Sequence, residues 1–157
     1  MTANAYAAPI AQSLQFFNRT CSVFRAQDAG YAPMEDQFTV AQQVAHVAQT
    51  LSWFIAGGFG PSGFDLDFQA HLQEVRRCDS LADAFCRLED SARAATEILA
   101  TQTAAQMMEP LPAGPIMGGE PRAAIVAAIV EHTAHHRGAL AVYARLLGYE
   151  PPIPYTE

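Results

Sequence analysis

The chain has 157 residues, half of them hydrophobic, which is enough to bury one sizeable core without help from disulfides. Its net charge of -7 comes from 16 acidic and 9 basic residues spread along the chain. That distribution leaves no basic stripe to follow a phosphate backbone, so nucleic acid is excluded as a partner. The length predicts a single domain over residues 1–157.

Cysteine usage and the N-terminus bear on the compartment. Cys21, Cys78 and Cys86 are odd in number, and the last two fit neither a CxxC redox pair nor a thiolate zinc site. The N-terminal stretch lacks the positive charge and the unbroken apolar run of a secretory signal. No run of about 18 apolar residues occurs, so no membrane span is expected. These features predict a protein of the reducing cytoplasm.

Four long segments show helical periodicity, and no alternating run is long enough for a sheet. The first helix is expected over about residues 5–26, with Pro9 in its first turns. Thr39 and Gln42 form a capping-box pattern, which predicts a second helix running to Ile55 before the sequence GGFGPSG ends it. The fold class is therefore predicted to be all-α.

The second half of the chain supplies two more helices. Residues 64–79 are ambiguous between a loop and a loop followed by a short helix. A third helix is expected over residues 81–103, capped by Asp79 or Ser80.

A Pro- and Gly-rich connection then leads to a fourth helix that opens with Pro121 in its first turn. This helix is expected to end at Leu147, where Gly148 and the prolines after it stop it. Four such helices predict a four-helix bundle, in which sites are built from side chains on facing helices.

Three of the five histidines fall in the sequence EHTAHHRG of the fourth helix. On a helical wheel, His132 and His136 lie in the apolar stripe formed by Ile125, Ile129, Leu140, Tyr143 and Leu147. His135 falls roughly 90° away, so it either supports a metal ligand from behind or, as we expect, faces solvent. We expect Arg137 to form a structural ion pair with Glu131 or with a carboxylate on a neighbouring helix, and His71 to be exposed.

Two imidazoles at positions i and i+4 can reach a single ion. His46, on the flank of the second helix's apolar stripe, would be the third ligand if that flank faces the last helix. Three histidines leave a coordination position open, as in catalytic zinc sites, and zinc and nickel both suit imidazole. The alternative is that each histidine is a core residue hydrogen-bonded to a carbonyl or a carboxylate, which is the commoner role of a lone histidine such as His46.

The stretch HTAHHRGALAVYARLLGYEPP resembles the C-terminal signature of the DinB/YfiT-like family of metalloenzymes, whose typical form is H-x-x-H-H-R-G-Q-L. His46 with Trp53 is similar to a second family pattern, and the length agrees over the whole chain. The resemblance implies an up-down-down-up bundle with a metal bound by His46, His132 and His136. Ala139 stands where the family commonly has glutamine, so any polar contact that the glutamine makes near the site is in question.

A divalent ion on three neutral imidazoles keeps its charge and favours an anionic ligand such as a thiolate. The family includes thiol-dependent S-transferases and a mycothiol-dependent maleylpyruvate isomerase. The resemblance therefore favours an enzyme that activates a low-molecular-weight thiol for S-transfer to, or isomerisation of, a small-molecule substrate.

Two other functions stay open. One is hydrolysis by water that the metal activates, although no glutamate lies on the inner stripe of either ligand helix. The other is a bundle that the metal only stabilises, or that senses the metal. We also expect a homodimer, because the apolar stripes of the first and third helices look wider than one core needs and because family members form dimers.

Overall fold

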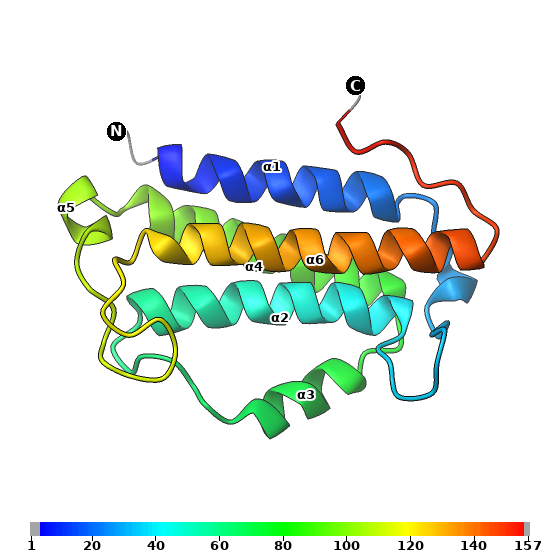
Figure 1. Cartoon of the computed structure of the whole chain (residues 1–157), viewed down its shortest axis with the longest axis horizontal. Helices are drawn as coiled ribbons and strands as arrows, with labels where there is room; N and C mark the ends of the chain where they lie inside the picture. The colour runs from blue at the N-terminus through cyan, green and yellow to red at the C-terminus, as the bar shows by residue number, and fades with distance from the viewer. Residues whose placement is uncertain (1–3, 156–157) are drawn as a thin grey trace.

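The computed structural model describes residues 4–155 and consists of helices lying side by side (Figure 1). Four of them are long: α1 (Asn4–Cys21), α2 (Val40–Phe59), α4 (Leu81–Ala100) and α6 (Ala124–Leu146). Three are short: η1 (Ala26–Asp28), α3 (Phe68–Arg76) and α5 (Ala104–Met107). Over residues 4–155 there is no strand, only an isolated bridge between Pro110 and Pro121, so the predicted all-α class is confirmed.

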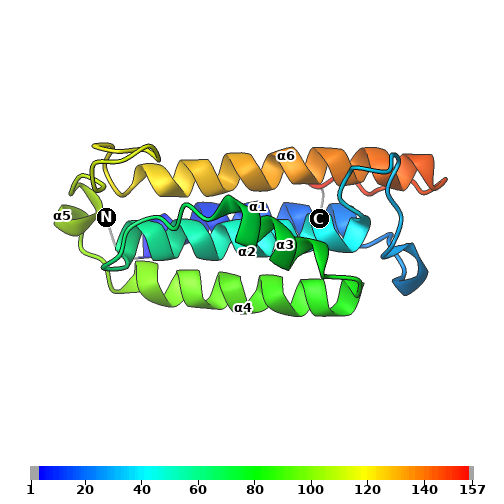
Figure 2. The same cartoon turned by 90° about the horizontal axis from the view of Figure 1, so that it is seen from below.

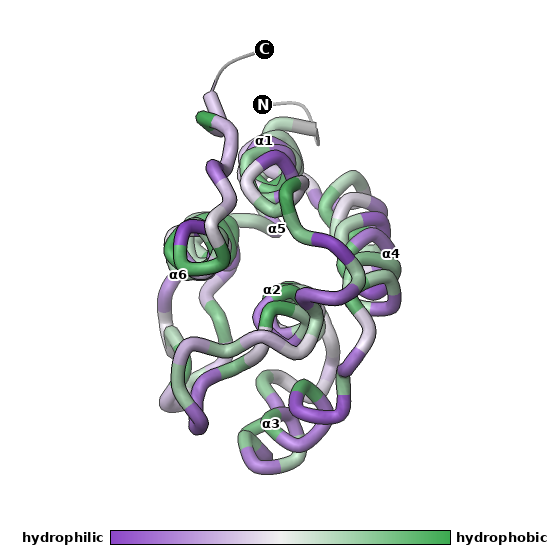
Figure 3. The backbone as a smooth tube through the Cα atoms, turned by 90° about the vertical axis from the view of Figure 1, so that its right-hand side faces the viewer, coloured by the Kyte–Doolittle hydropathy of each residue, from purple (hydrophilic) through white to green (hydrophobic). Residues whose placement is uncertain are grey.

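The long helices form a square when the molecule is seen end-on (Figure 3). In this square α1 lies diagonally opposite α2, and α4 lies opposite α6. Helices α1 and α6 run in one direction and α2 and α4 in the other, which is the expected up-down-down-up order. The short α3 lies outside the square against the outer side of α2 (Figure 2).

The predicted apolar stripes meet inside the square and form its core. Side chains three or four positions apart on each long helix are buried there, as expected for an amphipathic helix. Representative members are Leu14, Phe17 and Cys21 of α1, Val44, Val47 and Leu51 of α2, Leu88, Ala95 and Leu99 of α4, and Ile125, Ile129 and Leu140 of α6. None of the helices described could cross a membrane.

Helix α2 begins as predicted but ends later. The Thr39 hydroxyl accepts a hydrogen bond from the Gln42 amide at 3.3 Å, and the Gln42 side chain accepts one from the Thr39 amide at 3.1 Å. The helix then continues past Ile55 to Phe59. The predicted end at Ile55 was wrong, because glycine tolerates a helix interior when packing offsets its weak propensity.

Two glycines inside α2 are sites of close packing. A Cβ atom at Gly57 would overlap the ring of Phe64, and one at Gly58 would overlap the end of the Ile125 side chain. The absence of these side chains lets the segment after α2 fold back onto the helix and lets α6 approach it. The helix ends instead at Gly60, which has extended backbone angles.

Two further helix ends differ from the sequence predictions. Helix α1 ends at Cys21, not near residue 26, because the Ser22 hydroxyl donates to the Arg19 carbonyl at 2.8 Å, a local bond that competes with the helix. Helix α4 ends at Ala100, where the Thr101 side chain binds the Ile98 carbonyl at 2.7 Å. The loop that follows contains the short helix α5.

Pro121 does not open the last helix, contrary to the prediction. It lies in the bridge with Pro110, and the backbone amides of Arg122 and Ala123 donate to carbonyls of the preceding connection at 3.0 Å and 2.9 Å. The backbone at residues 121–123 instead forms a tight turn, in which the Ala124 amide donates to the Pro121 carbonyl at 2.8 Å, and α6 starts at Ala124.

Candidate metal centre

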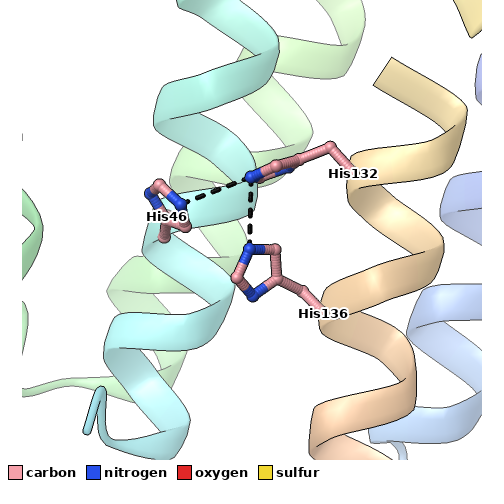
Figure 4. A group of neighbouring side chains, drawn as sticks. All are labelled: His46, His132 and His136. Atoms are coloured by element: carbon pink, nitrogen blue, oxygen red, sulfur yellow. Dashed lines mark hydrogen bonds between the residues drawn. The ribbon is translucent and has the colours of Figure 1, made fainter. Parts of the chain in front are cut away.

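Three histidines converge where α2 and α6 face each other (Figure 4). His46 comes from the second turn of α2, and His132 and His136 stand one turn apart on α6. The Nε2 atom of His132 lies 3.3 Å from Nε2 of His46 and 3.1 Å from Nε2 of His136. All three potential ligand atoms lie within 4.8 Å of one another. The structure thus brings together the three histidines that the sequence predicted.

The spacing of these nitrogens fits a shared metal ion. Nitrogens bonded at about 2.0–2.1 Å to one tetrahedral ion stand roughly 3.3–3.4 Å apart. The two Nε2 separations of 3.3 Å and 3.1 Å are close to that value. Across the part of the chain that the structure describes, no other three histidine, cysteine or carboxylate side chains form such a group. The three histidines could therefore hold a divalent metal.

Burial keeps these imidazoles uncharged. It is the main cause that lowers the pKa of His136 to about 3, and the neighbouring imidazoles of His132, His46 and His135 lower it further. Burial also lowers the pKa of His132 to about 4 and lowers the pKa of His46. At pH 7 all three rings are neutral, which is the form that binds a metal.

A hydrogen-bond chain fixes the orientation of the His136 ring. The Tyr143 hydroxyl lies 3.1 Å from the Phe38 carbonyl and from Gln37 Oε1, and both of these atoms accept hydrogen bonds. Tyr143 therefore donates, and its oxygen accepts from Gln43 Nε2 at 3.2 Å. The remaining amide oxygen of Gln43 lies 2.5 Å from Nδ1 of His136.

Because Gln43 Oε1 can only accept, Nδ1 of His136 carries the proton and Nε2 carries the lone pair. The lone pair therefore faces the other two histidines. A partner on the second ring nitrogen is the usual support of a metal-binding histidine. Helical periodicity placed Tyr143 in the apolar stripe of the last helix but did not identify Gln43. The available signal was a glutamine at a position of the apolar stripe of α2, three residues after Val40 and four before Val47.

Of the two residues beside His136, His135 lies as predicted and Arg137 does not. His135 is exposed, as predicted, although its ring lies 4.9 Å from that of His136. The ion pair predicted for Arg137 was wrong. Its guanidinium lies 5.7 Å from the Phe16 ring and 5.4 Å from the Tyr155 ring, and it donates to the Tyr155 hydroxyl at 3.0 Å. Arg137 thus holds the C-terminal segment against α1.

A pocket of about 410 Å³ adjoins the histidine cluster. His46 and His132 form part of its wall, together with the polar side chains of Gln49, Thr50 and His71. The rest of the wall is apolar and consists of Phe38, Trp53, Phe54, Phe68 and Leu72.

His71 was predicted to be exposed, and that prediction was wrong. It lies on α3, which turns the ring towards α2, so that the side chain is only 21% exposed. Its Nε2 lies 3.5 Å from the Asp65 carboxylate.

The three cysteines of the chain are not part of the histidine cluster. Cys21 and Cys78 are buried and Cys86 is exposed, and none of the three belongs to a disulfide. Burial raises the pKa of the Cys21 thiol well above its usual range. The group that could hold a metal therefore consists of histidines alone, in line with the spacing of the cysteines.

Comparison with known proteins agrees with the geometry. No curated protein matches the sequence. The family model described as the DinB family matches residues 5–157, nearly the whole chain. The three histidines to which the sequence resemblance assigns the metal are the ones that converge between α2 and α6. The chain belongs to the DinB family.

Proposed function

We propose that the protein is a metal-dependent enzyme in which His46, His132 and His136 bind a divalent ion, zinc or nickel. The ion would activate a low-molecular-weight thiol for S-transfer to, or isomerisation of, a small molecule. The observation that carries the proposal is the convergence of three neutral imidazoles at the edge of a 410 Å³ pocket. Three protein ligands leave a coordination position for a substrate, which is the arrangement of catalytic zinc sites.

The protein's own groups support this chemistry. A divalent ion on neutral ligands favours an anion and lowers the pKa of a bound thiol. Gln43 holds His136 with its Nε2 lone pair directed at the site. The mostly apolar wall of the pocket lowers the local polarity beside the histidines, which strengthens electrostatic interactions there.

The pocket wall favours a thiol over water as the nucleophile. Hydrolysis needs a group that takes the proton of the attacking water, and none of the residues lining this pocket is a carboxylate. A thiol has a much lower intrinsic pKa than water, so on a divalent ion it would lose its proton to solvent near neutral pH and would need no such base. Hydrolysis remains the second candidate because the His71 imidazole lies in the wall, and histidine is a common general base.

Elemental analysis of the purified protein tests the metal site. We expect about one zinc or nickel per chain in the native protein and little in the His46→Ala variant. His135→Ala is the matched control, because this exposed neighbour lies outside the cluster and its loss should leave the metal content unchanged. A native protein without bound metal would remove the basis of the proposal.

An activity assay tests whether the protein transfers a thiol. Metal-loaded protein is incubated with an aromatic electrophile and with bacillithiol, mycothiol, glutathione or cysteine, and loss of free thiol is measured. We expect one thiol to be consumed, and His132→Ala to abolish the reaction. If none of the four reacts, the S-transfer proposal is wrong.

A metal that only stabilises the bundle would be revealed by a large loss of melting temperature on chelation without any thiol consumption. The predicted homodimer and cytoplasmic location belong to the proposal as well. Sedimentation equilibrium and cell fractionation test them.

A further inference from the structure

We infer that the pocket beside the three histidines binds a neutral aromatic molecule, and that this molecule is the acceptor in the reaction proposed above. The identity of the bound class follows from the pocket wall alone. Only its role as the acceptor rests on the proposed function.

Aromatic side chains from three segments form the wall. Trp53 lies on α2, with its ring centroid 6.1 Å from that of Phe68 on α3. Phe38, which precedes α2, packs its ring 5.2 Å from that of His46. Aromatic rings pack against other rings at such distances with a gain beyond the burial of area alone. The volume of about 410 Å³ is near the lower end for small-molecule sites, so it suits a substituted ring.

Charge is missing from this wall but not from the cavities around it. No arginine, aspartate or glutamate is among the residues lining the 410 Å³ pocket. The adjacent cavity of about 470 Å³ is lined by Glu74, Arg87 and Asp90, and another of about 380 Å³ by Asp36 and Arg76. Of these three neighbouring cavities, the one that reaches the histidines is the one whose wall carries no arginine, aspartate or glutamate. Away from the metal position itself, an anionic group placed against this wall would lose its hydration without gaining a cationic side chain.

The pocket is held open by bonds at both ends of α3. The Trp53 indole donates to the Asp65 carbonyl at 2.7 Å, just before the helix begins. At the other end, the Gln42 side chain donates to the carbonyl of Arg76 at 3.0 Å. These bonds hold α3 against the outside of α2 (Figure 2). Because both ends are tied, Phe68 and the rest of the outer wall are in place before a ligand arrives, which reduces the ordering cost of binding.

Trp53 is the single tryptophan of the chain and lines both this pocket and the adjacent 470 Å³ cavity, so its fluorescence reports a ligand bound in either one. The metal-loaded protein is titrated with 4-nitrotoluene, a neutral quencher, and separately with 4-nitrobenzenesulfonate, an anion that ligates metals weakly. We expect saturable quenching by 4-nitrotoluene and at least tenfold weaker binding of the sulfonate. Equal binding of the two probes, or quenching that never saturates, would overturn the inference.

Variants locate the binding. Phe68 is 54% exposed, so Phe68→Ala should fold and should weaken 4-nitrotoluene binding by about threefold to tenfold. Met108→Ala removes another exposed apolar side chain, 64% exposed and away from the pocket, and should leave 4-nitrotoluene binding unchanged. Leu72→Arg adds a cation to the wall and should raise the affinity for the sulfonate at least tenfold. If neither Phe68→Ala nor Leu72→Arg alters binding, the probes bind elsewhere and the inference is wrong.

The aromatic ligand and the proposed thiol chemistry are tested by independent measurements. Quenching of Trp53 requires no thiol and no turnover, whereas elemental analysis and thiol consumption say nothing about the pocket wall. Selective binding of 4-nitrotoluene by a protein that consumes no thiol would keep the aromatic ligand and remove its role as acceptor. Thiol consumption with no preference between the probes would leave the proposed function and remove the inference.

Discussion

Replacing Gln43 tests whether the hydrogen-bond chain behind His136 supports metal binding. Gln43→Leu keeps a side chain of similar size but removes the acceptor of the His136 Nδ1 proton and the donor to the Tyr143 hydroxyl. The His136 ring then loses the contact that fixes its tautomer and its direction. We expect the variant to fold and to bind the metal more weakly.

The magnitude follows from what Gln43 contacts. Losing the partner of a metal-binding histidine typically costs tenfold to a hundredfold in metal affinity, or about 1.4–2.8 kcal/mol. The Nδ1 proton of His136, a buried side chain that is 8% exposed, is also left without an acceptor. That adds about 1–3 kcal/mol to the cost of folding the metal-free protein. Gln43→Glu, which retains an acceptor oxygen, should keep most of the metal affinity.

Competition with a chromogenic zinc chelator measures the affinity, and circular dichroism verifies the fold. Gln42→Leu is the matched control, since this neighbouring glutamine belongs to the capping box and contacts none of the histidines. It should lower stability by about 0.5–1 kcal/mol and leave the affinity unchanged. Native affinity in Gln43→Leu would show that the chain does not orient the ligand.

Three further outcomes are expected. Gly58→Ala should destabilise the protein by about 1–2 kcal/mol in urea denaturation, because overpacking against the buried Ile125 outweighs the gain in helix propensity. Gly138→Ala, in α6 with open space around it, should instead stabilise the protein by about 0.5–1 kcal/mol; destabilisation by both changes, or by neither, would contradict the packing argument. The metal-free protein should lose stability in urea as the pH falls from about 6.5 towards 4. In the unfolded chain the histidines protonate near their ordinary pKa of about 6.5, whereas in the fold the pKa is about 4 for His132 and about 3 for His136, so protons favour the unfolded state over this range. His132→Gln should reduce this loss, and equal pH dependence in the variant would refute the assignment.

The parts of the structure that periodicity encodes could be predicted. A side chain's position on a helix follows from its residue number, so the stripes of the long helices and the shared face of His132 and His136 could be inferred from spacing. The start of α2 could be inferred as well, because the capping box of Thr39 and Gln42 is local in sequence. The proximity of His46 required the resemblance, since spacing alone does not show which helices are neighbours.

The features that depend on distant partners could not be predicted. Gln43 and His136 are 93 positions apart, so nothing local in either segment shows that they bond. Gly57 and Gly58 resemble a helix end in sequence, and only their packing against Phe64 and Ile125 explains why the helix continues. His71 looked like a residue of an exposed loop until the position of α3 turned it towards the pocket.

The position of α3 also explains how a partly buried histidine cluster can be reached by a ligand. On α2, the residues His46, Thr50 and Trp53 share a flank that lies roughly 120° from the stripe of Val44, Val47 and Leu51. The valine and leucine stripe fills the core, and the other flank faces the 410 Å³ pocket. A site built on the core side would be closed by four long helices. Built on this flank, it is covered by one short helix, and a ligand reaches the three histidines by displacing at most the contacts of α3.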